Sequence, residues 1–238
     1  ISYPAFSAAL APVALFGLVA VIVIIRLVYR SEFERGTELT PEVHRGRMHK
    51  GQVVKAVVVC IGLAIAFFAG VPVAKAALIG GAILLLTRSI KPSRIYREID
   101  GPLLFMFAGL FVVVAGAERT LLTPELVASA KSFGLDNVWR LSAFTAVLSN
   151  IMSNVPAVLA LAPFVPGLDD PRRAWLVVAM SSTLAGNFTL LGSVANLIVA
   201  EQARTAGTTL GFWAFFKVGL PLTLVTLAAG AAWLAIQS

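Results

Sequence analysis

The stretch SNIMSNVPAVLALAP, residues 149–163, contains Ser-Asn twice, four residues apart, in an otherwise very apolar part of the chain. A packed apolar helix needs no amides or hydroxyls there, and Pro156 cannot donate a helical hydrogen bond. The run 141–168 around it contains no Asp, Glu, Lys or Arg. It is long enough for one tilted span, but the polar cluster and the proline fall at its middle. We therefore predict a re-entrant hairpin over residues 141–165, with two half-helices meeting at a non-helical tip.

The composition of the whole chain indicates a membrane protein. Hydrophobic residues make up 58% and charged residues 13% of the 238 residues, and the mean hydropathy is +0.89. A soluble domain carries roughly 25% charged residues. We predict an all-α membrane protein, a polytopic helical bundle that forms a single transmembrane domain over residues 1–238. Besides the hairpin, apolar runs predict spans at about 5–29, 53–71, 73–87, 101–117, 174–200 and 212–235.

The net charge of +7 comes from basic residues that gather in loops. Such loops face the cytoplasm, so the segment 30–52, with its many arginines and lysines, is predicted to be a cytoplasmic loop. A nucleic-acid partner is not expected, because these bases do not lie on an aromatic-studded face. We predict a multi-pass protein of the bacterial inner membrane, surrounded by membrane lipid.

A second group of polar residues and glycines interrupts the run after residue 174, which predicts a discontinuous helix over residues 174–203. Irregular backbone at membrane depth is tolerated only where it is packed in protein or lines a wet cavity, so we expect both breaks to share one cavity. Free N–H groups at half-helix starts attract anions, and free carbonyls at half-helix ends attract cations. Polar residues in membrane helices also join helices together without binding a ligand, and this alternative stays open. The candidate substrate- and ion-binding residues are Ser149, Asn150, Ser153, Asn154, Gly186, Asn187, Thr189, Gly192, Ser193 and Asn196.

Enzymatic chemistry finds little support in the sequence. A membrane-embedded lipid or isoprenoid transferase is the rival hypothesis, and it needs clustered acids or histidines with metal-ligand spacing. His44 and His49 lie in the charged loop without a matched carboxylate or cysteine. We predict no catalytic residue, no metal site and no cofactor, with Na⁺ or H⁺ as the possible coupling ion.

Three motifs together resemble a known group of transporters. The hairpin motif, AGNFTLLGSVANLIVAEQA (185–203) and IDGPLLFMFAGLFVVVAGAERT (99–120) are similar to the second half of the ion transporter superfamily. This superfamily contains citrate transporter-like permeases, arsenite permeases and sodium/dicarboxylate symporters, and the spacing matches the arsenite-permease-like branch best. The resemblance implies that the hairpin tip and the unwound helix hold the substrate and the coupling ion, in a homodimer with an elevator-like motion.

Two departures qualify what the resemblance implies. The dicarboxylate symporters carry Ser-Asn-Thr, whereas Ile151 and Val155 follow the asparagines here, which argues against dicarboxylate specificity. Members of the superfamily resemble inverted repeats with one motif pair in each half, and this chain contains one pair. We therefore expect half of an inverted-repeat transporter that lacks its N-terminal half.

The expected function is secondary active, ion-coupled transport of a small anion, either a carboxylate or an inorganic oxyanion of the arsenite type. One alternative is a cation/proton antiporter of the same superfamily. Another is a membrane assembly module that does not transport.

Overall fold

The computed structural model describes residues 1–31, 50–86 and 133–237, and residues 101, 104, 105, 108, 109, 112, 113, 115 and 116. Most of the predicted loop 30–52 and much of the predicted span 101–117 lie outside the described residues. The chain divides into two compact units. The first contains Ile1–Ala8 and Thr37–Met106, and the second contains Ala9–Gly36 and Phe107–Ser238. The single transmembrane domain over 1–238 stays a prediction.

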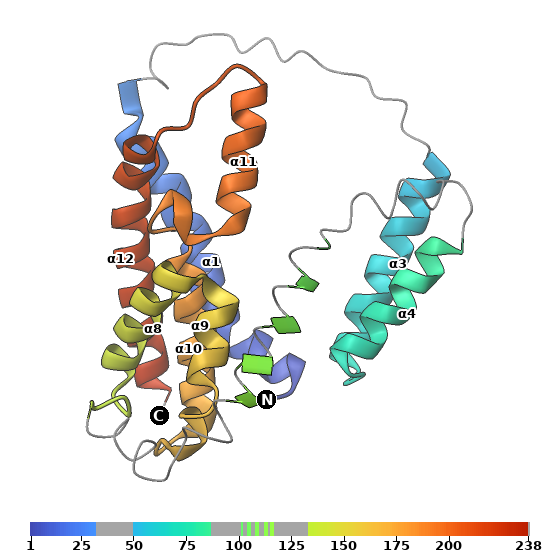
Figure 1. The fold of residues 1–238 in the computed structure, drawn as a ribbon, viewed down its shortest axis with the longest axis horizontal. Coiled ribbons are helices and arrows are strands. Elements are labelled where there is room, and N and C mark those ends of the chain that lie inside the picture. The colour runs from blue at the N-terminus through green and yellow to red at the C-terminus, as the bar shows by residue number, and fades with distance from the viewer. Residues whose placement is uncertain are drawn as a thin grey trace. The chain divides into compact units, whose positions relative to one another are not determined.

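The described residues form helices and turns and contain no strand (Figure 1). Three described helices are long and apolar enough to cross a membrane: α1 (Tyr3–Val28), α3 (Lys50–Phe68) and α12 (Phe212–Ile236). Their bounds lie within three residues of the predicted spans. The prediction of an all-α membrane protein is thus confirmed.

In the first unit, α3 and α4 (Val73–Leu85) form a helical hairpin. The turn between them contains Gly70 at φ 84°, a conformation that favours glycine. Gly80 lets the helices approach closely, because a Cβ atom there would lie 2.9 Å from the Leu63 side chain. The Lys55 ammonium donates to the carbonyl of Ile83 at 2.5 Å, which satisfies an unpaired carbonyl near the end of α4.

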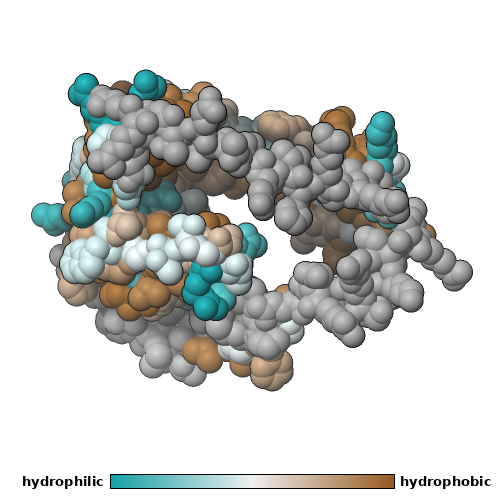
Figure 2. Space-filling model, turned by 90° about the horizontal axis from the view of Figure 1, so that it is seen from above, coloured by the Kyte–Doolittle hydropathy of each residue, from teal (hydrophilic) through white to brown (hydrophobic). Residues whose placement is uncertain are grey.

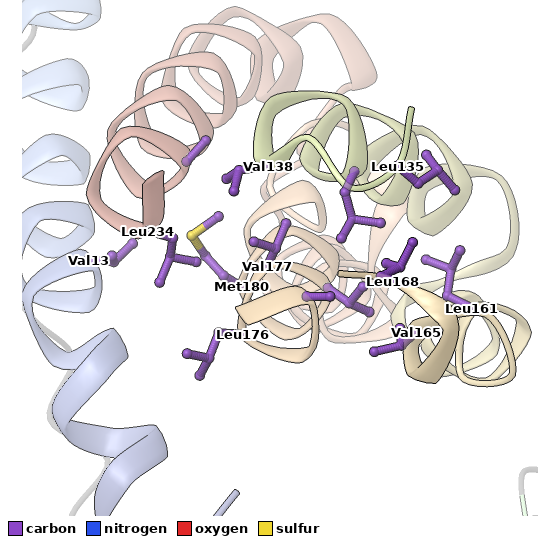
Figure 3. Packing of buried hydrophobic residues seen from close by; sticks show 14 residues of the cluster. Val13, Leu135, Val138, Leu161, Val165, Leu168, Leu176, Val177, Met180 and Leu234 are labelled. Atoms are coloured by element: carbon purple, nitrogen blue, oxygen red, sulfur yellow. The ribbon is translucent and has the colours of Figure 1, made fainter. Parts of the chain in front are cut away.

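The second unit is built around α10 (Pro171–Ala185), which packs against α8 (Val138–Met152), α9 (Asn154–Leu161) and α12. Val177 and Val178 of α10 are fully buried, and Figure 3 shows Val177 and Met180 within the apolar cluster. Val13 of α1 and Leu234 of α12 belong to the same cluster. Apolar contact with three helices therefore fixes the position of α10.

Two polar caps fix where the half-helices of the second unit begin. The Asn137 side chain accepts hydrogen bonds from the backbone N–H groups of Trp139 and Arg140, at 2.9 and 3.3 Å. The Asp170 carboxylate accepts from the N–H of Arg173 at 3.0 Å, at the start of α10. Such caps satisfy N–H groups that have no partner within the helix. They also bring polar and charged residues to the end of the unit at which α8 and α10 start.

Large apolar side chains cover much of the surface of the described residues. Among the coloured residues on the face in Figure 2, hydrophilic ones form only small clusters between hydrophobic ones. Leu15, Leu18 and Ile22 of α1 are each more than 60% exposed. A surface of this kind suits a hydrocarbon environment, because water would make such exposure costly.

Candidate functional site

The hairpin of α8 and α9 breaks at the predicted polar cluster. The first helix ends at Met152 and the second starts at Asn154, with Ser153 between them. With 15 and 8 residues, the helices are about 22 and 12 Å long, shorter than the hydrocarbon core of about 30 Å. The structure thus has a helix break at Ser153, while the re-entrant hairpin with its tip inside the membrane stays a prediction.

Ser153 has an unusual backbone conformation, with φ 72° and ψ 163°. This region is populated almost solely by glycine, and a residue with a side chain costs about 1–3 kcal/mol there. Ser153 gives no side-chain cap to α9. Among the described residues, its hydroxyl makes one hydrogen bond, a long one of 3.4 Å to the amide oxygen of Asn154. The tip of the hairpin is thus held in a strained conformation by its surroundings.

We expect Ser153→Gly to raise the free energy of unfolding by about 1–3 kcal/mol, because glycine adopts this conformation without strain. Thermal unfolding of the protein in detergent measures the change. The control is Ser142→Gly within α8, which should lower stability, since glycine is a poor helix former and the buried hydrogen bond to Ser181 is lost. A Ser153→Gly protein that melts below the wild type would contradict the strained tip.

The discontinuous helix also breaks where the sequence predicts. Helix α10 ends at Ala185, a short 3₁₀ turn covers Leu190–Gly192, and α11 (Val194–Thr205) follows. The side-chain amide of Asn196 donates to the carbonyl of Gly186 at 2.8 Å and to that of Thr189 at 3.4 Å. One side chain of the second half-helix thus satisfies carbonyls that the break has freed.

Asn150 joins the two breaks. Its amide nitrogen donates to the carbonyl of Ala185, the last residue of α10, at 2.9 Å, and to that of Ala146 at 3.1 Å. Its amide oxygen accepts from the hydroxyl of Thr189 at 3.2 Å. A Cβ atom at Gly192 would lie 2.8 Å from that oxygen, so glycine is needed for the approach. We call these two segments, residues 149–154 and 185–196, the joined breaks.

The predicted residues fall into two groups. Ser149, Asn150, Thr189 and Asn196 make hydrogen bonds within the protein; Ser149 is fully buried and donates to the carbonyl of Ser182 at 2.9 Å. These bonds correspond to the helix-joining role that the sequence left open.

The remaining predicted side chains make few or no hydrogen bonds to other described residues. Asn187 and Ser193 are half-buried, and neither side chain has a hydrogen bond in the described part of the chain. Ser153 and Asn154 are half-buried as well and make no hydrogen bond to the second break among the described residues. Gly186 and Gly192 are buried within the joined breaks.

Sequence reasoning missed a layer of buried hydroxyls between α8, α10 and α12. Ser142 and Ser181 share a hydrogen bond of 2.8 Å, whereas the hydroxyls of Thr145 and Thr223 are buried without a partner among the described residues. Ser142, Thr145 and Ser149 are spaced by three and four residues, which places them on one face of α8. That spacing was the signal in the sequence.

Gly219 of α12 was also missed. The backbone carbonyls of Asn187 and Phe188 lie against it, so that a Cβ atom would meet both. The second break therefore packs directly on the backbone of α12. The signal was weak, because Gly219 is one of two glycines in an otherwise ordinary apolar helix.

The joined breaks contain no charged side chain among the described residues 149–154 and 185–196. No cluster of His, Cys, Asp or Glu that could hold a metal ion occurs in the described part of the chain. In the described part of the site, helix starts are the remaining source of positive potential: Ser153 and Ser193 precede α9 and α11 without capping them through their side chains. The site thus offers neutral donors and helix ends.

Comparison with known proteins gives a consistent result. The transporter arsB of Dictyostelium discoideum is 36% identical over 173 residues, which cover 70% of this chain and 31% of that protein. The silicon efflux transporter LSI3 of Oryza sativa subsp. japonica is 35% identical over 188 residues, or 74% of this chain and 39% of that protein. The uncharacterized transporter slr0753 of Synechocystis is 25% identical over 260 residues, which cover 91% of this chain and 57% of that protein.

These relatives are named as transporters rather than enzymes, and this chain spans between 31% and 57% of their lengths. No solved structure matches the chain significantly. The profile described as "Citrate transporter" matches residues 1–170, more than half of the 238 residues. The chain therefore belongs to the citrate transporter family.

Proposed function

We propose that this chain forms part of a secondary active transporter that binds a small anion at the joined breaks, with Na⁺ or H⁺ as the coupling ion. One observation carries the proposal. Two helix breaks are fastened together by Asn150, while Asn187 and Ser193 beside them keep half-buried polar groups without a partner in the described structure. Polar groups left unpaired in such a place are costly unless a solute or water completes their bonds.

The electrostatics favour an anion near the start of α11. The first N–H groups of a helix have no partner within it, and the helix dipole adds positive potential there. Ser193 immediately precedes this helix and leaves it without a side-chain cap. An oxygen-bearing anion could accept hydrogen bonds from these N–H groups and from the Ser193 hydroxyl.

The neutral lining also bears on the class of substrate. A multiply charged carboxylate is usually held by arginine or lysine, and the described residues of the joined breaks include neither. A small inorganic oxyanion requires fewer charged partners. The names of two relatives, a silicon efflux transporter and arsB, support this preference over citrate.

The assembly is part of the proposal. We propose that the transporter is a homodimer in the bacterial inner membrane and that a second half with a matching motif pair completes each cavity. A cation/proton antiporter of the same superfamily would use the same breaks with a cation as substrate. A non-transporting module is favoured by the hydrogen bonds that already engage Ser149, Asn150, Thr189 and Asn196.

Substitution of the unpaired side chains tests the proposal. We expect Asn187→Ala and Ser193→Ala in the full-length protein to reduce transport at least tenfold without lowering thermal stability, because neither side chain holds the fold together. Cells that express each variant are assayed for arsenite and citrate flux, with membrane abundance measured in parallel. Thr183→Ala is the control, since its hydroxyl bonds to the carbonyl of Ala179 on the same helix at 2.8 Å.

The outcomes separate the candidates. Loss of flux in both variants with normal flux in the control supports the site. Normal flux in all variants removes Asn187 and Ser193 from it. No arsenite or citrate flux in the wild type, together with cation-driven proton exchange, would favour the antiporter.

A further inference from the structure

A groove of about 490 Å³ lies between α8 and α12 in the second unit. On the α8 side, the residues that line it recur every three to four positions from Trp139 to Ile151, so the groove follows one face of the helix. Twelve residues of rise correspond to about 18 Å. One leaflet contributes half of a hydrocarbon core of about 30 Å. The groove is therefore about as long as one leaflet is deep.

The lining of the groove is almost wholly apolar. Its polar members are Ser142, Asn150 and Thr223. The first two are already bonded, Ser142 to Ser181 and Asn150 to backbone carbonyls. Only the Thr223 hydroxyl lacks a partner in the described structure, and Thr223 is 2% exposed. The groove thus offers little to a polar solute and suits a hydrocarbon chain.

The end of the groove near the start of α8 carries residues that are typical of the headgroup level of a membrane. Trp139 lines the groove at its α8 start and is 50% exposed, as aromatic residues at the membrane interface often are. Arg140 follows it, is exposed, and has no carboxylate partner among the described residues. The N–H groups at the start of α8 are capped by Asn137, so Arg140 is the group that would meet a phosphate at this level.

We propose that this groove binds one acyl chain of a phospholipid, with the lipid phosphate beside Arg140, in the leaflet at which α8 begins. The far end of the chain then lies against Asn150 and Phe188, which line the inner end of the groove. The lipid therefore contacts the joined breaks from the membrane side. This binding does not depend on the transport that we propose above.

Native mass spectrometry of the full-length protein in mild detergent tests the proposal, with phosphatidylglycerol as the probe. The wild type should retain one phospholipid per chain. Val147→Trp fills the groove and should reduce retention at least tenfold, and Arg140→Gln should reduce it several-fold. The control is Phe144→Trp, because Phe144 is exposed on the same helix but does not line the groove. Equal retention by Val147→Trp and Phe144→Trp would overturn the proposal.

Two further measurements keep the test decisive. Ala228→Phe narrows the groove from α12 and should reproduce the loss if Val147→Trp fails to fold. A photoreactive amino acid at position 147 should attach to phospholipid in membranes. Attachment to protein alone would show that a helix fills the groove and would refute lipid binding.

Discussion

Gly219→Ala is expected to destabilise the protein and to abolish most of its transport. The added methyl group would meet the carbonyl oxygen of Asn187, and it would lie 2.9 Å from that of Phe188. Both obstacles are backbone atoms, so α12 or the second break must shift. Overpacking of this kind costs typically 1–3 kcal/mol, which we expect to appear as a lower melting temperature. Because Asn187 itself would be displaced, flux should fall at least tenfold.

The matched control for this substitution is Gly17→Ala in α1. A Cβ atom there would have its nearest neighbour, the Thr226 methyl group, at 4.0 Å, an ordinary contact. Its melting temperature and flux should match or slightly exceed the wild type, because alanine favours helix more than glycine does. If Gly219→Ala had the same melting temperature and flux as Gly17→Ala, the result would contradict a close approach between α12 and the second break.

Asn150→Ala should have the second-largest effect. It removes the donor to the carbonyl of Ala185 and the acceptor of the Thr189 hydroxyl. A buried polar group left without a partner costs about 1–3 kcal/mol, so the two breaks should separate or rearrange. We expect a lower melting temperature together with flux reduced at least tenfold, measured in the same assays.

Asn150→Asp shows whether the hydrogen bonds of Asn150 or only the volume of its side chain matter for stability and transport. Aspartate keeps the size of the side chain and the acceptor for Thr189, but its carboxylate cannot donate to the carbonyls of Ala146 and Ala185. It should therefore be at least as damaging as alanine. Wild-type stability with loss of flux alone would instead identify Asn150 as a direct ligand of the substrate.

The sequence predicted the helical membrane fold and the position of both breaks. Apolar runs of about 20 residues, interrupted by Pro156, Gly186 and Gly192, were sufficient, because backbone preferences and hydropathy act locally. The pairing of the two breaks followed from a general constraint on irregular backbone in membranes. That constraint does not say which side chains make the contact.

The sequence did not predict which polar residues make hydrogen bonds within the protein and which do not. Asn150 and Asn187 have the same chemistry, yet Asn150 binds two backbone carbonyls and Asn187 none in the described structure. The difference depends on where each side chain lies relative to other helices, which is a tertiary property. For the same reason, the contact of Thr223 with the groove had no signal in the sequence, and that of Gly219 with the second break had only a weak one.

The two limbs of the hairpin are fastened unequally. Ser142, Ser149 and Asn150 tie α8 to α10 by hydrogen bonds. By contrast, α9 meets α10 without a side-chain hydrogen bond in the described part of the chain, through apolar contacts alone. Detaching α9 would thus break no directional bond to α10, and it would relieve the strain at Ser153. Apolar burial, which has no preferred direction, therefore holds α9 on α10, whereas three hydrogen bonds fix the register of α8.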